Sequence, residues 1–104
     1  MPDFVAAART DEVPPGAMKL VEIAGEEVVV ANVGGVYYAF ANECTHSGGP
    51  LSEGELEGEQ VTCPWHFTSF DVKTGQPLSG PGHAPVPTYQ TLVEDGEIRI
   101  APPG

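Results

Sequence analysis

Glycine and proline recur along this chain at intervals too short for long helices. There are 13 glycines and 11 prolines among 104 residues, and they follow no period. Proline removes a backbone donor and glycine loosens a helix, so few windows favour an extended helical segment. Turn-forming residues at this density are typical of a protein made of short β-strands. We therefore predict an all-β fold, and the length predicts a single domain over residues 1–104 with one hydrophobic core.

Several stretches are rich in β-branched residues or alternate between apolar and polar side chains, as half-buried strands do. Two hairpins are expected, because Gly34-Gly35 and Glu94-Asp95-Gly96 each separate two such stretches. Near the N-terminus, we predict a helical turn over 6–9 and a loop over 11–16. The predicted strands are 18–23, 27–33, 36–40, 60–62, 69–72, 89–93 and 97–100.

The net charge is −11, from 15 acidic and four basic residues. A surface this negative repels nucleic-acid phosphates and anionic membranes, so neither is an expected partner. It favours fast, salt-sensitive association with a basic partner, although acidity also simply keeps a protein in solution. No segment approaches the roughly 20 apolar residues that cross a bilayer, and the N-terminus lacks the pattern of a signal peptide. We expect a soluble, cytoplasmic protein and a monomer.

Both cysteines and two of the three histidines form two short pairs. Cys44-Thr45-His46 and Cys63-Pro64-Trp65-His66 are separated by the sixteen residues 47–62. Both pairs fall within 41–87, a segment that holds seven of the thirteen glycines and is predicted to be mostly loop. Loops held by a rigid sheet commonly carry function, so 41–87 is the predicted site-bearing subdomain. Two thiolates and two imidazoles offer four ligands to a metal.

These residues permit four kinds of site. Counting alone allows a disulfide between Cys44 and Cys63, although a reducing cytoplasm disfavours it. Structural cysteines with surface histidines are also conceivable, but two such tight pairs are not expected by chance. A Cys₂His₂ zinc site would be four-coordinate, although zinc fingers usually keep the cysteine pair apart from the histidine pair. A Rieske-type two-iron cluster suits the mixed pairs, because two cysteines bind one iron and two histidines bind the other.

The spacing Cys-x-His followed by Cys-x₂-His resembles the Rieske motif. The flanking stretches 50–54, 61–66 and 70–71 are similar to bacterial Rieske ferredoxins that serve aromatic-ring-hydroxylating oxygenases, and the resemblance runs from Asp11 to Gly96. It implies a Rieske fold of three antiparallel sheets, with two cluster-binding loops at one tip. It also implies one [2Fe–2S] cluster. The metal and cofactor ligands would be Cys44 and Cys63 on the inner iron, and His46 and His66 on the outer iron.

The resemblance implies a one-electron carrier between a flavin-containing reductase and a terminal oxygenase component. The chain would not itself be an enzyme, because it is too short to add the mononuclear iron domain of an oxygenase. The alternatives are a small subunit of a reductase such as nitrite reductase, and a zinc-stabilised interaction module. The acidic residues expected to help steer a basic partner are Glu53, Glu55, Glu57 and Glu59.

Positions near the second pair bear on the reduction potential. Rieske proteins of respiratory complexes typically have a serine and a tyrosine where this chain has Thr68 and Phe70. Phe70 cannot donate a hydrogen bond to a cluster sulfur, so we expect a low potential, towards about −150 mV. Trp65 has two interpretations: it packs under the ligand loop, or it lines a docking surface beside the imidazoles. His83 is expected to lie on the surface or beside the cluster rather than to be a ligand.

Overall fold

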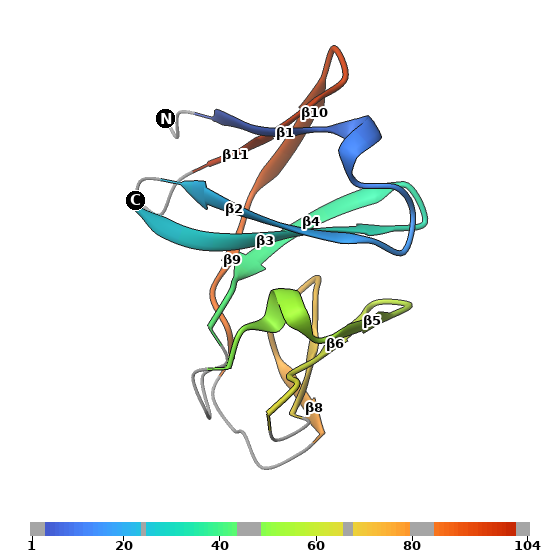
Figure 1. Cartoon of the computed structure of the whole chain (residues 1–104), viewed down its shortest axis with the longest axis vertical. Helices are drawn as coiled ribbons and strands as arrows, with labels where there is room; N and C mark the ends of the chain where they lie inside the picture. The colour runs from blue at the N-terminus through green and yellow to red at the C-terminus, as the bar shows by residue number, and fades with distance from the viewer. Residues whose placement is uncertain (1–3, 24, 44–48, 66–67, 80–84, 102–104) are drawn as a thin grey trace.

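The computed structural model describes residues 4–23, 25–43, 49–65, 68–79 and 85–101. These residues form three antiparallel sheets and two short 3₁₀ helices, with no α-helix among them (Figure 1). The helices are η1 (Thr10–Glu12) and η2 (Leu51–Glu53). The strands are β1 (Val5–Arg9), β2 (Met18–Ile23), β3 (Glu26–Val33), β4 (Val36–Ala41), β5 (Glu55–Glu57), β6 (Gln60–Thr62), β7 (Ser69–Asp71), β8 (Pro77–Ser79), β9 (Thr88–Tyr89), β10 (Thr91–Glu94) and β11 (Glu97–Ile100). The predicted all-β fold of three antiparallel sheets is confirmed.

The three sheets differ in how the chain builds them. The terminal sheet has the order β1-β11-β10, and the middle sheet has the order β2-β3-β4-β9. The inserted sheet, β5-β6-β7-β8, is formed by the chain between β4 and β9 and lies below the other two in Figure 1. Its two ends stay together, because Ala39 pairs with Tyr89 and the Ala41 N–H donates to the Pro87 carbonyl at 2.9 Å. The middle sheet therefore holds the inserted sheet at both of its ends.

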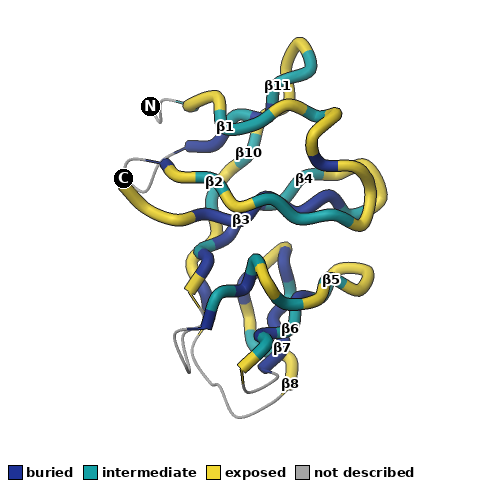
Figure 2. Tube along the Cα trace, viewed as in Figure 1, coloured by how far each residue is buried: buried dark blue, intermediate teal, exposed yellow. Residues whose placement is uncertain are grey.

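Strand β3 is buried on both of its faces. Its residues 28–32 are all buried, as the dark stretch in Figure 2 shows. Val28 and Val30 pack with the terminal sheet, whereas Val29 and Ala31 pack with the inserted sheet. A strand that is covered on both sides does not alternate in polarity, which explains the unbroken apolar run in its sequence.

The expectation of a single core is wrong, because the described residues form two buried clusters. The two clusters lie on opposite faces of the middle sheet. The chain therefore buries its apolar side chains in two small cores, one on each face, and not in a single core. The first joins the middle sheet to the inserted sheet and contains Val29, Ala31, Phe40, Leu51, Val61, Cys63, Phe70, Val72 and Val86. The second joins it to the terminal sheet and contains Val13, Ile23, Val28, Val30, Ala39, Ile98 and Ile100.

Some predicted elements are also corrected. The helical turn predicted at 6–9 is wrong: β1 covers these residues and pairs with β11, so tertiary pairing overrides the low strand propensity of alanine. The strand predicted at 89–93 divides at Gln90, because β9 joins the middle sheet while β10 joins the terminal sheet. Two short strands of the inserted sheet, β5 and β8, were not predicted.

The described part of the chain contains no helix long and apolar enough to cross a membrane.

Candidate metal centre

One of the four predicted ligands, Cys63, lies in the described part of the chain. Cys44, His46 and His66 fall outside the described residues, as do Phe67 and His83. Among the described residues alone, no group of three or more Cys, His, Asp or Glu side chains could hold a metal ion. The described residues flank the two loops that carry the proposed ligands. We call residues 43–50 the first ligand loop and residues 63–68 the second ligand loop.

Two hydrogen bonds that Asn42 accepts close the base of the first ligand loop. The Leu51 N–H donates to the Asn42 carbonyl at 2.7 Å, and the Ser52 N–H donates to Asn42 Oδ1 at 2.9 Å. Just inside these bonds, Glu43 and Pro50 form an antiparallel bridge. Asn42 is itself buried, so its polar groups need these partners. The two ends of the loop are therefore held next to each other.

Asn42 also joins this loop to the middle sheet. Its backbone N–H donates to the Glu27 carbonyl at 3.1 Å, and its Nδ2 donates to Glu27 Oε1 at 3.3 Å. Glu27 belongs to β3, the central strand of the fold. The position of the first ligand loop is thus set by the most deeply buried strand of the molecule.

The second ligand loop connects β6 to β7. It is closed where the Cys63 N–H donates to the Thr68 carbonyl at 2.9 Å. One residue further out, the hydroxyl oxygens of Thr62 and Ser69 lie 3.2 Å apart and share a hydrogen bond. Cys63 and Thr68 both have no exposed surface. A predicted ligand therefore lies at the buried end of a fixed hairpin, among the apolar residues of the first core.

The two ligand loops touch at Gly49. A Cβ atom at this glycine would lie 2.9 Å from Sγ of Cys63 and 3.0 Å from both Cγ and Cδ2 of Trp65. The backbone of Gly49 therefore lies so close to the Cys63 sulfur and the Trp65 indole that there is no space for a side chain at this position. Trp65 remains 57% exposed, so it lies over Gly49 and is not packed beneath the loop. Of its two predicted positions, the exposed fraction favours the one at the surface.

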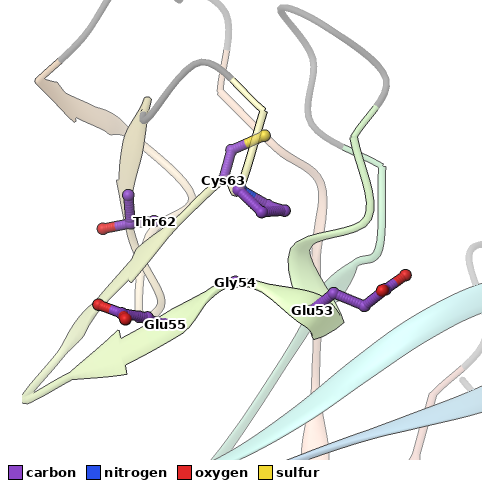
Figure 3. Close-up of a pocket in the computed structure, with 6 residues that line it drawn as sticks. Glu53, Gly54, Glu55, Thr62 and Cys63 are labelled. Carbon is purple, nitrogen blue, oxygen red and sulfur yellow. The ribbon is translucent and has the colours of Figure 1, made fainter.

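A small open pocket borders Cys63. Its volume is about 220 Å³, and it is lined by Glu53, Gly54, Glu55, Thr62, Cys63 and Pro64. Figure 3 shows the Cys63 sulfur pointing away from Gly54, and the Glu53 and Glu55 side chains pointing in opposite directions. The two carboxylates do not converge on a common ion.

Charge around the inserted sheet is dominated by carboxylates. The chain has four basic residues, and each forms an ion pair with an acid: Arg9 with Asp11, Lys19 with Glu12, Lys73 with Glu59, and Arg99 with Glu97. Hydrogen bonding to Glu59 is the main cause that raises the pKa of Lys73. All four glutamates expected to attract a basic partner are exposed to solvent: Glu53, Glu55, Glu57 and Glu59.

Comparison with known proteins identifies the family. The Rieske [2Fe–2S] domain matches residues 3–90 of this chain. The chain belongs to the Rieske family. Its relatives include the ferredoxin component of the naphthalene 1,2-dioxygenase/salicylate 5-hydroxylase systems from Ralstonia sp., 35% identical over 98 residues that make up 94% of each chain. Ferredoxin CarAc of Metapseudomonas resinovorans is 36% identical over 99 residues, 94% of this chain and 92% of that one.

Solved structures agree with this assignment. The ferredoxin of carbazole 1,9a-dioxygenase from Nocardioides aromaticivorans IC177 superposes with a TM-score of 0.92 at 35% identity, over 96% of this chain and 98% of that one. A chain in a complex of reduced oxygenase and oxidized ferredoxin in carbazole 1,9a-dioxygenase gives a TM-score of 0.89 at 33% identity, over 94% and 92%. The expected Rieske fold is confirmed, and so is the expected [2Fe–2S] cofactor.

The donor set in this chain fits that cofactor. Cys63 offers a soft sulfur donor from a buried position, and a Rieske cluster takes two cysteines and two histidines, the donor types that the two pairs of this chain contain. The relatives are ferredoxin components, which are electron-transfer subunits, as expected for a chain that is not an enzyme. The sequence predicts four donors, an assignment that stays a prediction, and it does not single out Asn42 or Gly49. Asn42 had no recognisable signal, and Gly49 stood out only as the second glycine of Gly48-Gly49-Pro50.

Proposed function

We propose that this chain carries single electrons from a flavin-containing reductase to the terminal oxygenase component of an aromatic-ring-hydroxylating system. One observation carries this proposal: ferredoxin components of such systems are similar to the chain over 94% of its length. The same relatives disfavour the alternative of a small subunit of nitrite reductase. The proposal includes a cytoplasmic monomer whose 1–104 domain holds the cluster within 41–87.

We propose Cys44 and Cys63 as ligands of the inner iron, and His46 and His66 as ligands of the outer iron. The spacing of the two pairs supports this assignment, as does the burial of Cys63 at the closed end of its hairpin. The bound cluster supplies a site that accepts and releases one electron. The chain's own part is to hold the two loops against each other and to keep water away from the Cys63 sulfur. Histidine ligation raises the potential relative to four thiolates, because the oxidised centre is then close to neutral.

The potential is proposed to lie at the low end of the Rieske range. Phe70 lies on β7 with no exposed surface, and it packs with Cys63 in the first core. Its ring offers no hydroxyl to a cluster sulfur, and a cluster with fewer hydrogen bonds to its sulfurs has a lower potential. A midpoint potential near about −150 mV is expected. A value above about +100 mV would contradict this part of the proposal.

The proposal is tested on the anaerobically purified protein. We expect visible absorption of a red-brown protein, and after reduction by dithionite a rhombic EPR signal with an average g below the free-electron value. A colourless protein that contains zinc and no iron would refute the electron-carrier function and leave the fold standing.

The proposed ligands are tested with a matched pair of histidine variants. His66→Ala should abolish the rhombic signal, because it removes a proposed ligand of the outer iron. His83→Ala should preserve the signal, because it removes the histidine that has no cysteine partner in the sequence. Loss of the signal in both variants, or in His83→Ala alone, would overturn the assignment.

A further inference from the structure

Trp65 is an unusual residue to leave in solvent. It is the only tryptophan of the chain. At 57%, its exposed fraction is the highest among the large apolar side chains that are exposed in the described part of the chain. An aromatic side chain of this size stabilises a complex strongly when a partner covers it. A tryptophan side chain that stays in solvent contributes little to the stability of the folded monomer.

The indole is exposed but not loosely held. Gly49 lies so close that an added Cβ would be 3.0 Å from two of its ring atoms. The loop beneath it is closed by the hydrogen bond between Cys63 and Thr68, and Pro64 precedes it with a restricted backbone. A rigid, exposed aromatic loses little conformational entropy on binding, so much of its contact energy is available for affinity.

The surroundings of Trp65 indicate the charge of the surface that would cover it. Glu53 and Glu55 are exposed and line the same pocket as Pro64, the residue before Trp65, and Glu43 is exposed at the start of the first ligand loop. The four basic residues of the chain are each paired with an acid, and the one that belongs to this part of the fold is Lys73, in the turn between β7 and β8. A complementary surface would therefore present an apolar pocket with basic residues at its rim.

We propose that Trp65 is the apolar anchor through which the chain docks on the oxygenase component. This inference rests on the proposed function and adds the residue that makes the contact. The partner surface is an apolar pocket, rimmed by lysine or arginine, near the site that accepts the electron. Aromatic residues that fill such pockets commonly dominate the affinity of an interface. Because Trp65 lies between two proposed ligands in the sequence, docking through it brings the cluster close to the partner.

The experiment measures the dissociation constant of the cluster-loaded protein for a purified terminal oxygenase that the wild-type chain reduces. Trp65→Ala should weaken binding by about 30-fold, and Trp65→Phe by less than about 5-fold, because a phenyl ring still fills most of the pocket. Leu92→Ala is the matched control. Leu92 is 40% exposed on β10, in the terminal sheet and far from the inserted sheet in Figure 1, and its loss should leave the affinity unchanged.

The midpoint potential of each variant is measured alongside the affinity. The anchor role predicts weaker binding of Trp65→Ala with a potential equal to that of the wild type. Unchanged affinity of Trp65→Ala would overturn the proposal. A shifted potential with unchanged affinity would also overturn it, and would make the indole a shield of the cluster. Electron transfer by the wild-type chain tests the proposed function, whereas the variants test the anchor, so the two can fail separately.

Discussion

Gly49 and Cys63 are in contact across the two ligand loops, with room for no further atom. A Cβ atom at Gly49 would lie 2.9 Å from Cys63 Sγ, a separation that real Cβ atoms essentially never show. Gly49 does not have the left-handed backbone that favours glycine, so it is the lack of space that excludes a side chain. This contact places the end of one loop directly against a proposed ligand of the other.

Substituting Gly49 by alanine should therefore impair cluster binding. The new methyl group forces Sγ of Cys63, the indole of Trp65 or the loop backbone to move, and such overpacking costs about 1–3 kcal/mol. We expect less iron and sulfide per chain after purification, and faster bleaching of the visible absorption in air.

Gly58→Ala is the control for Gly49→Ala. It lowers the stability of the fold without placing a methyl group against the ligand loops. Gly58 has a φ of +60° and no atom within 4 Å of its added Cβ. Alanine there costs about 1–2 kcal/mol of backbone strain without approaching the loops. Equal loss of cluster in both variants would show that stability alone governs cluster content.

Asn42 and Asn32 form a matched pair of buried asparagines at different places in the fold. Asn42 closes the first ligand loop, whereas Asn32 donates to the Val13 carbonyl at 2.7 Å and accepts from the Gly35 N–H at 2.8 Å. Alanine at either position should lower the free energy of unfolding by about 1–3 kcal/mol, because buried or partly buried polar groups lose their hydrogen bonds.

Only the Asn42 substitution should change the metal centre. We expect Asn42→Ala to alter the EPR linewidths and to speed up iron loss, while Asn32→Ala keeps the wild-type spectrum at equal loss of stability. Denaturant unfolding and EPR on both variants provide the test. Identical spectra in the two variants would mean that Asn42 does not position the ligand loop.

The acidic surface of the inserted sheet should speed association with a basic partner. The double variant Glu53→Gln/Glu55→Gln should slow association with the oxygenase several-fold at low ionic strength, and the difference should shrink as salt is added. The control is Glu94→Gln/Asp95→Asn, which removes the same charge from the end of β10 and the β10–β11 turn, at the opposite end of the long axis (Figure 1). Equal slowing by both would indicate a response to net charge rather than to a local surface.

The ionisation of Tyr89 should lower the free energy of unfolding in strongly alkaline solution. Burial, with a smaller contribution from the charge of Glu26, raises the pKa of Tyr89 above its ordinary value of 10.0. The folded state therefore releases this proton less readily than the unfolded chain. The associated stability is fully present below about pH 10 and is lost as the pH rises through the folded pKa.

Tyr89→Phe should remove this contribution to the pH dependence. Unfolding free energies measured between about pH 9 and 11 should fall less steeply for the variant than for the wild type. Parallel curves for the two proteins would contradict the predicted linkage.

The strands themselves were largely predictable, because β-branched runs and Gly-Gly or Asp-Gly turns are local signals. The β2–β3–β4 meander and the β10–β11 hairpin fall within a few residues of their predicted positions. β1 was missed because its Val-Ala-Ala-Ala-Arg sequence has no strand signal, and its pairing with β11 supplies what propensity does not. β5 and β8 are three-residue strands, too short for any period to be recognised.

The sequence by itself predicts the chemistry of the site. The identity and spacing of the proposed donors, Cys-x-His and Cys-x₂-His, are properties of two short segments, and they require no knowledge of the fold. Only the tertiary structure decided how the frame of this site is built: the closure of the first loop by Asn42, the burial of β3 on both faces, and the approach of Gly49 to Cys63 and Trp65. These contacts join residues that are distant along the chain. Their energies depend on which surfaces meet, and no local pattern encodes that.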